Sequence, residues 1–210
     1  MGIKPVAASS RRQPYPVAAR ELLRNSLLDA AREEVGRRRW ADVTMADVAM
    51  AAGVSRQTLY KEFGSREEFA QALVLREADN LLDAVEQAMH DNREHPPAAM
   101  AAAFDVYLTA AAENPLIRAV VSADGAAELL TLLTTHGEPL LERSSERLKL
   151  LLHTVWPRMR DDDAELLSEC LVRLAISYAA LPKGPASMSA ASVARLLGPY
   201  VESLGRPAPG

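Results

Sequence analysis

The sequence has one cysteine, few aromatic residues and no long hydrophobic run, and each shortage excludes a class of protein. Cys170 is the single cysteine among 210 residues, so no disulfide can form within the chain. No apolar stretch approaches the ~20 residues needed to cross a bilayer, and no secretion signal precedes the first helical pattern. We therefore expect a cytoplasmic protein that folds around a hydrophobic core without disulfides.

Motifs for catalysis and metal binding are also missing. The four histidines have no metal-ligand spacing with one another or with Cys170, and the sequence contains no H-E-x-x-H motif, Walker loop or dinucleotide-binding glycine motif. Residues 161–163 are all aspartate, but acids directly before a helix more often cap its start. Leu167 and Leu171 flank Cys170 and indicate a buried, inert thiol. We expect no enzyme activity, cofactor or metal.

The sequence instead shows helical periodicity over most of its length. Apolar residues recur at steps of three and four from Ala18 to about Arg39, and no segment of useful length alternates with the period of two that strands show. The pattern predicts four helices in the first ninety residues. Further helices are expected at about 98–113, 115–122, 125–135, 138–156, 162–181 and 189–204. The predicted fold class is all-α.

The two ends of the chain differ in charge. Residues 1–76 contain 13 basic and 9 acidic side chains, whereas residues 77–210 contain 11 basic and 19 acidic ones. The first part therefore has a net charge of +4 and the second of -8, within a total of -4. A positive end suits a polyanion such as DNA, although chance variation in solvated surface charge would give the same pattern.

Residues 44–63 have the pattern of a helix-turn-helix. Thr44 and Asp47 predict a capped helix start, Gly53 suits a positive φ at the turn, and Ser55 predicts a second cap. Small and apolar residues between these points let the two helices pack closely. In this motif the start of the second helix enters the major groove, which leaves its polar side chains facing DNA. A further capping box at Ser65 predicts a long helix after the motif.

This region resembles the DNA-binding domain of the TetR/AcrR family of bacterial transcription regulators. The residues that carry the resemblance are, in order, 44–49 (TMADVA), 53–55 (GVS), 58–63 (TLYKEF) and 64–69 (GSREEF). The resemblance implies a homodimer whose subunit has an N-terminal three-helix helix-turn-helix domain and a larger helical domain for ligand binding and dimerisation. The predicted parts are a flexible basic arm (1–19), the DNA-binding domain (20–64), the effector-binding and dimerisation domain (65–205) and a flexible tail (206–210).

The resemblance also implies which side chains contact DNA. Arg56, Gln57 and Thr58 fall at base edges, where Arg can bond a guanine and Gln an adenine through two hydrogen bonds. The other implied residues, apart from the capping Ser55, fall at phosphates, which fix the register without reading sequence. The full predicted set is Thr44, Ser55, Arg56, Gln57, Thr58, Tyr60, Lys61 and Arg66.

In the family, the helices after the connecting helix usually enclose a small-molecule pocket, and ligand binding releases the DNA. Residues 77–204 are rich in Leu, Ala and Val, so we expect an apolar pocket and a lipophilic effector. A long-chain fatty acid or related lipid would suit it, with its head near His136 or Arg173. The candidate lining residues are Phe104, Tyr107, Leu108, Leu133, His136, Trp156, Cys170, Arg173 and Ser177. For each of them, ordinary packing is the competing explanation.

Two late helices have the pattern of a dimer interface. The helix at 162–181 is apolar on two sides, which requires burial on two sides, either inside the domain or against a partner subunit. With the helix at 189–204 it would form half of a four-helix interface. The predicted interface residues are Leu167, Leu171, Leu174, Tyr178, Leu181, Val193, Leu197, Tyr200, Val201 and Leu204.

These observations favour a sequence-specific transcription regulator. Repression is the expected mode, because a compact dimer can act most simply by covering a promoter. Two recognition helices about 34–36 Å apart would require a near-palindromic operator of double-stranded DNA. The alternative is a helical protein-interaction module whose helix-turn-helix only packs, and such a module would not bind DNA specifically.

Overall fold

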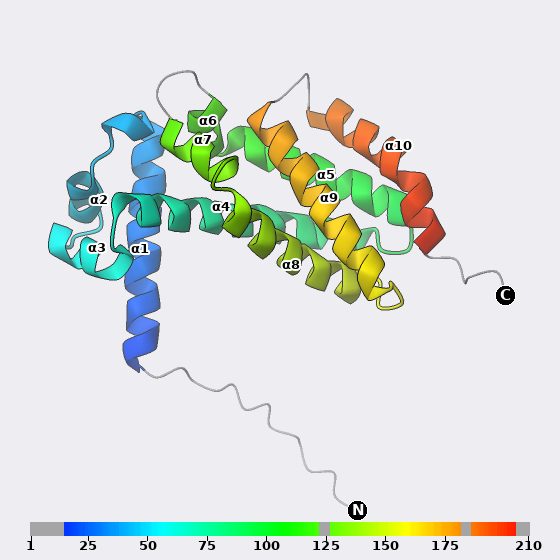
Figure 1. The fold of residues 1–210 in the computed structure, drawn as a ribbon, viewed down its shortest axis with the longest axis horizontal. Helices are drawn as coiled ribbons and strands as arrows, with labels where there is room; N and C mark the ends of the chain where they lie inside the picture. Colours follow the sequence, from blue (N-terminus) through cyan, green and yellow to red (C-terminus); the bar gives the residue numbers. More distant parts are fainter. Residues whose placement is uncertain (1–14, 122–126, 182–185, 205–210) are drawn as a thin grey trace, which may run out of the picture.

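The computed structural model describes residues 15–121, 127–181 and 186–204. Within these ranges the chain forms ten α-helices, one 3₁₀ turn and no strand, which confirms the predicted all-α fold (Figure 1). The elements are α1 (Tyr15–Arg37), η1 (Trp40–Asp42), α2 (Met45–Ala51), α3 (Arg56–Phe63), α4 (Arg66–Asp91), α5 (Pro96–Glu113), α6 (Pro115–Val121), α7 (Ala127–Leu133), α8 (Glu138–Val155), α9 (Asp161–Ala180) and α10 (Ala186–Leu204). In the described ranges, no helix is both long and apolar enough to cross a membrane.

Helices α1, α2 and α3 form an N-terminal head. Helix α1 begins at Tyr15, earlier than the expected start at Ala18, so the last residues of the predicted arm are helical. Pro16 fits there because proline is tolerated in the first turn of a helix. The rest of the predicted arm and the predicted tail at 206–210 lie outside the described residues.

Capping boxes begin α2 and α4, as the sequence predicts. Thr44 Oγ1 accepts a hydrogen bond from the Asp47 backbone N–H at 3.2 Å, and Asp47 Oδ2 accepts one from the Thr44 backbone N–H at 2.9 Å. The Thr44 hydroxyl and backbone N–H, together with Arg38, lower the pKa of the Asp47 carboxyl. Ser65 and Glu68 make the same reciprocal pair at 3.1 and 2.7 Å. Local hydrogen bonds therefore fix both helix starts.

Helix α4 belongs to both of the hydrophobic cores. One core contains Trp40 and Leu59 of the head, Phe69 of α4, and Leu129 and Leu140 of α7 and α8. The other core lies among α4, α5, α8, α9 and α10. Figure 1 shows α4 running from the head into the larger group of helices. The head and the C-terminal domain (α4–α10) are thus joined through packed side chains.

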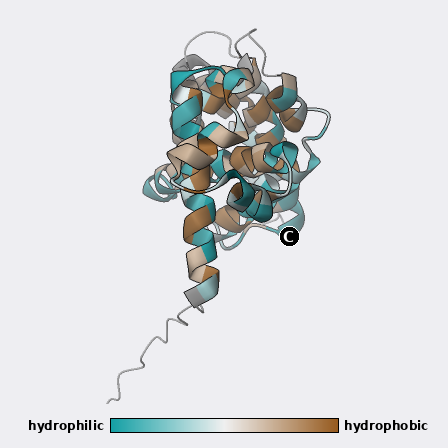
Figure 2. Cartoon of the chain, turned by 90° about the vertical axis from the view of Figure 1, so that its left-hand side faces the viewer, coloured by the Kyte–Doolittle hydropathy of each residue, from teal (hydrophilic) through white to brown (hydrophobic). Residues whose placement is uncertain are grey.

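The C-terminal domain is a bundle in which α5 packs against α4 and α10, and α8 packs against α4 and α9. Helices α6 and α7 lie at the end nearest the head (Figure 1). Figure 2, which views the molecule from the side of the head, shows hydrophobic and hydrophilic residues alternating along the helices. The second core lies inside this bundle, between the helices that form it.

Candidate DNA-binding surface and ligand cavity

Helix α3 is held in the head by its buried side and by its first turn. Leu59 and Phe63 are buried against the head. Ser55 Oγ accepts a hydrogen bond from the Thr58 backbone N–H at 3.1 Å, and Gly53 has a φ of +71° in the turn before the helix. The predicted cap and turn are confirmed. The opposite side of α3 consequently faces solvent.

That exposed side carries the side chains of Arg56, Gln57 and Lys61. Among the described residues, Gln57 and Lys61 have no hydrogen-bond or ion-pair partner. The Arg56 guanidinium carbon lies 5.2 Å from the centroid of the Tyr60 ring, and its Nη2 donates to the Tyr60 hydroxyl at 3.4 Å. Thr58 is half-buried beside them. This surface offers amide, guanidinium, ammonium and phenol groups, which bind base edges and phosphates.

The end of α3 is fastened to α1 through Glu62. Arg20 Nε donates to Glu62 Oε2 at 2.6 Å, and Arg24 Nη1 donates to the Glu62 carbonyl at 2.5 Å. The Arg24 guanidinium carbon also lies 4.0 Å from the centroid of the Phe63 ring. These contacts fix the orientation of α3 on the head before any DNA is bound.

Arg66 was expected at a phosphate, but the structure places it inside the junction between the head and the C-terminal domain. It donates to the carbonyls of Val43 and Trp40 at 2.5 and 3.0 Å and to Glu128 Oε2 at 3.2 Å. Trp40 Nε1 donates to the same Glu128 oxygen at 2.7 Å. Glu128 belongs to α7, so one carboxylate ties α7 to both η1 and the start of α4.

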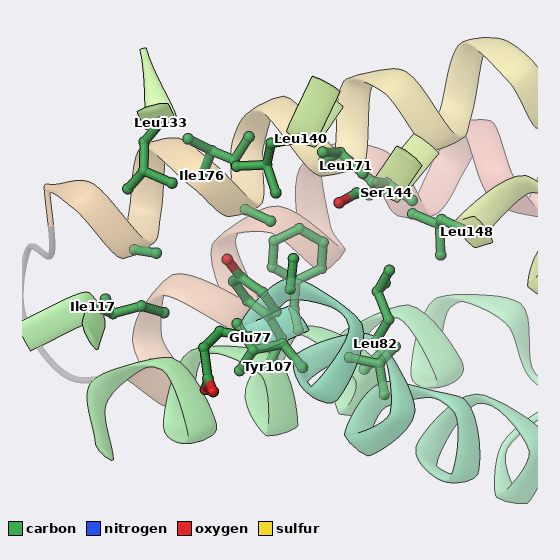
Figure 3. A pocket seen from close by; sticks show the side chains of 18 of the residues that line it. Glu77, Leu82, Tyr107, Ile117, Leu133, Leu140, Ser144, Leu148, Leu171 and Ile176 are labelled. Atoms are coloured by element: carbon green, nitrogen blue, oxygen red, sulfur yellow. The ribbon is translucent and has the colours of Figure 1, made fainter. Parts of the chain in front are cut away.

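A cavity of about 120 Å³ lies in the C-terminal domain, between side chains of α4, α5, α6, α7, α8 and α9. Engineered apolar cavities of about 150 Å³ bind benzene, so this space suits a small organic group. Its wall is apolar except for Glu77, Tyr107 and Ser144. Figure 3 shows Ile117 at one end of the cavity and Leu148 at the other. Burial raises the pKa of the Tyr107 hydroxyl, which therefore stays protonated.

Three of the nine predicted lining residues lie in this wall, namely Phe104, Tyr107 and Leu133. Leu108 is buried in the same core but does not line the cavity. Trp156 lies beyond the wall, where its Nε1 donates to the Arg93 carbonyl at 2.9 Å.

The remaining four predicted lining residues lie on the outside of the protein. His136 is exposed, with Nδ1 at 3.8 Å from Glu67 Oε1. Cys170, Arg173 and Ser177 lie on the outer side of α9, where Cys170 is exposed rather than buried as expected. The inner side of α9, which includes Ala175 and Ile176, lines the cavity instead.

Sequence reasoning missed Glu77, although its position carried a signal. Glu77 lies four residues after Leu73 and four before Leu81 in an apolar stripe that continues to Val85. A charged residue at such a position must be buried, and Glu77 is 2% exposed. Buried acids need partners or a function, so this spacing singles it out. Ser144 of α8 gave no such signal.

Helices α9 and α10 turn most of the predicted interface residues toward their own subunit. Leu167, Leu171, Val193 and Val201 are 2–3% exposed in the core of the C-terminal domain, which leaves them no free surface for a partner. The half-buried side chains that pack against that core are Leu174, Tyr178, Leu197 and Tyr200. Leu181 is exposed, and the side chain of Leu204 lies outside the described residues. Among the described residues, the large apolar side chains that are exposed here are Leu166 on α9, Leu181 directly after α9 and Leu196 on α10.

A capped helix-turn-helix, a connecting helix and a helical domain with an apolar cavity together define a ligand-responsive DNA-binding regulator. Family models agree with this class: residues 27–73 match the model for bacterial regulatory proteins of the TetR family, and residues 96–199 match a model for the C-terminal domain of the bacterial tetracycline repressor. The chain belongs to the TetR family of bacterial transcription regulators, which are DNA-binding regulators and not enzymes. Members act on operator DNA as homodimers and bind small-molecule effectors.

Individual relatives extend over nearly the whole chain. The transcriptional regulator AlkX of Mycobacterium tuberculosis is 39% identical over 198 residues, which cover 94% of each protein. A crystal structure of the TetR family repressor AlkX from Dietzia sp., implicated in biodegradation of n-alkanes, superposes with a TM-score of 0.79 at 31% identity and covers 86% of this chain and 98% of that one. FadR of Thermus thermophilus with lauroyl-CoA shares the fold, with a TM-score of 0.61, 20% identity and coverage of 89% and 99%.

Proposed function

We propose that the protein is a repressor that binds a near-palindromic operator through the exposed side of α3 and leaves it when a lipophilic effector binds. The observation that carries the DNA-binding part is the pair of unpartnered polar side chains, Gln57 and Lys61, beside the positioned Arg56 and Tyr60. The repressor mode is supported by the AlkX repressor of Dietzia, which is 31% identical. Bacterial operators lie in the cytoplasm, so we place the protein there.

We assign base contacts to Arg56, Gln57 and Thr58, at the start of α3, and phosphate contacts to Tyr60 and Lys61. The start of a recognition helix enters the major groove, while residues one turn later lie near the backbone. Ser55 holds the first turn in place through its cap.

Thr44 stays a candidate phosphate contact, because it is exposed at the N-terminus of α2, where backbone dipoles favour an anion. We no longer propose Arg66 as a phosphate contact. Each of its three nitrogens donates to a protein group, namely Glu128 and the carbonyls of Val43 and Trp40. We assign Arg66 instead to holding the head on the C-terminal domain.

Replacing Lys61 with alanine tests the phosphate assignment. Affinity should fall for all duplexes, and the slope of log K against log salt should flatten by about one unit, because one counterion fewer is released. Fluorescence anisotropy at several salt concentrations measures both. Lys149→Ala is the matched control, since Lys149 is paired with Asp161 and Glu165 in the C-terminal domain. An unchanged slope for Lys61→Ala would contradict the assignment.

We propose that the dimer interface uses the outer sides of α9 and α10. Leu166 on α9 is 56% exposed, Leu181 directly after α9 is 77% exposed, and Leu196 on α10 is 70% exposed. Apolar side chains of this size are usually covered in a stable homodimer. Cys170, Arg173 and Ser177 lie on the same outer side of α9 and would fall in or beside this interface.

Replacing Leu196 with glutamate should weaken dimerisation about tenfold or more, because the substitution would bury a charge in a symmetric interface. Sedimentation velocity over a range of concentrations measures the change. Leu22→Glu is a closely matched control, because Leu22 is also 70% exposed but lies on α1. If both variants stay dimeric to the same extent as the unaltered protein, α10 does not contribute to the interface.

The effector class follows from the cavity. Its wall is apolar over most of its extent, which favours a lipophilic molecule. The n-alkane association of Dietzia AlkX and the lauroyl-CoA bound by Thermus FadR are in keeping with this proposal. The expected fatty-acid head-group partners, His136 and Arg173, do not line the cavity. A fatty acid in the cavity would therefore need another partner for its carboxylate.

A further inference from the structure

The cavity wall offers no cation to a ligand. Among the described residues that line it, Glu77 is the one with a charged side chain. A ligand carboxylate entering this space would lose its hydration without gaining a positive partner, and it would approach another carboxylate. The wall therefore disfavours an ionised acid as the head group of the effector.

One oxygen of the Glu77 carboxylate has no partner in the part of the chain that the structure describes. Its Oε2 accepts a hydrogen bond from Asn114 Nδ2 at 2.5 Å and lies 3.4 Å from Arg32 Nε. Its Oε1 is buried and has no hydrogen-bond partner among the described residues. Buried polar atoms in folded proteins nearly always have a partner, so an unpartnered oxygen on a residue that lines the cavity calls for a donor, which a ligand can supply.

A second polar group lies in the same wall. The Tyr107 hydroxyl has no hydrogen bond to any described residue, and in Figure 3 it points away from the Glu77 carboxylate, so the two groups lie at different places in the wall. A phenol can both donate and accept. A ligand hydroxyl can likewise donate to one group and accept from another, whereas an alkane can do neither.

We propose that Glu77 Oε1 is the head-group anchor of the effector site and that it selects an apolar alcohol over the corresponding carboxylate. The inference rests on the proposed effector site in this cavity. The alcohol hydroxyl donates to Glu77 Oε1, and the alkyl chain lies against the leucines of α4 and α8 that line the cavity.

The anchor is also connected to the DNA-binding head. The Glu77 carboxylate that would accept the ligand is the one that lies against Arg32 of α1. It also holds Asn114, whose Oδ1 caps α6 by accepting from the Leu116 and Ile117 N–H groups at 2.9 and 3.3 Å. A ligand bound at Oε1 therefore contacts the Glu77 carboxylate, which links α4 to α1 through Arg32 and to α6 through Asn114.

Calorimetric titration at neutral pH with 1-octanol, octanoate and n-octane tests the proposal on the full-length protein. We expect the alcohol to bind about tenfold or more tightly than octanoate. The alcohol donates a hydrogen bond to the charged Glu77 carboxylate, whereas the carboxylate of octanoate is repelled by it. The Glu77→Gln variant should lose most of this preference. Glu86→Gln, an exposed glutamate on the same helix, should keep it.

The outcomes separate this inference from the proposed function. Octanoate binding as tightly as the alcohol to the unaltered protein would overturn the alcohol preference while leaving a lipophilic effector in place. A Glu77→Gln variant that keeps the preference would show that Glu77 is not the anchor. The ranking on the unaltered protein decides the question even if Glu77→Gln does not fold. If none of the three ligands binds and operator binding is intact, both the lipophilic effector and the anchor are wrong.

Discussion

Replacing Trp40 with alanine should lower the free energy of unfolding by about 3–5 kcal/mol, the range found when large buried aromatic side chains are removed. Trp40 is 1% exposed and lies in the core that joins the head to the C-terminal domain. The substitution also removes the ring beneath the Arg66 guanidinium, whose carbon lies 4.5 Å from the ring centroid, and the hydrogen bond to Glu128. Chemical denaturation followed by circular dichroism measures the change.

Two further variants separate the parts of this effect. Trp40→Phe keeps an aromatic ring in the core but removes the Nε1 donor to Glu128, which still accepts from Arg66, and we expect a smaller loss of about 0.5–1.5 kcal/mol from the one hydrogen bond removed. Trp156→Ala is the control, because the second tryptophan is half-buried and lies far from the head. If Trp156→Ala lowers the free energy of unfolding as much as Trp40→Ala does, the junction contributes no more to stability than the rest of the protein.

Replacing Arg56 with alanine should weaken operator binding about 5- to 150-fold and relax the preference at the base pair that it reads, because a two-point contact contributes about 1–3 kcal/mol of discrimination. Its contact with Tyr60 holds the guanidinium at the start of α3 before binding, so little order has to be gained on the DNA. Anisotropy titrations with the operator and with single-base variants of it measure the effect.

Gln57→Ala should relax the preference at a different base pair, since Gln57 is an adjacent but separate exposed side chain. Arg158→Ala is the charge-matched control, because Arg158 is exposed in the connection between α8 and α9. Equal losses on all sequences for Arg56→Ala would assign it to a phosphate instead of a base.

The features that sequence could predict are the ones determined within a few residues. Thr44 with Asp47, and Ser65 with Glu68, are neighbours along the chain, so their capping hydrogen bonds depend on little else. Gly53 marks the turn for the same reason, because its positive φ of +71° is a local requirement. The helix-turn-helix and the all-α class follow from such signals.

The features that sequence could not predict depend on partners far along the chain. Arg66 has the position of a phosphate contact in the motif. Its side chain instead binds Glu128, which lies 62 residues further along the chain. The two apolar sides of α9 were recognised, yet which of them faces the cavity depends on how α8 and α5 pack against it. Cys170, Arg173 and Ser177 fell on the outer side for this reason. Glu77 shows that a charged residue within an apolar stripe is a better guide to a site than residue type alone.

Selection of bound duplexes from a random-sequence pool, at a low and a moderate salt concentration, tests the central claim most directly. We expect enrichment of a near-palindrome whose half-sites are about one helical turn, roughly 34–36 Å, apart, because two α3 helices in a symmetric dimer must enter successive major grooves. Enrichment should survive the higher salt concentration, although total binding should fall. If no sequence is enriched even at low salt, the exposed side of α3 does not read DNA and the proposed repressor function is wrong.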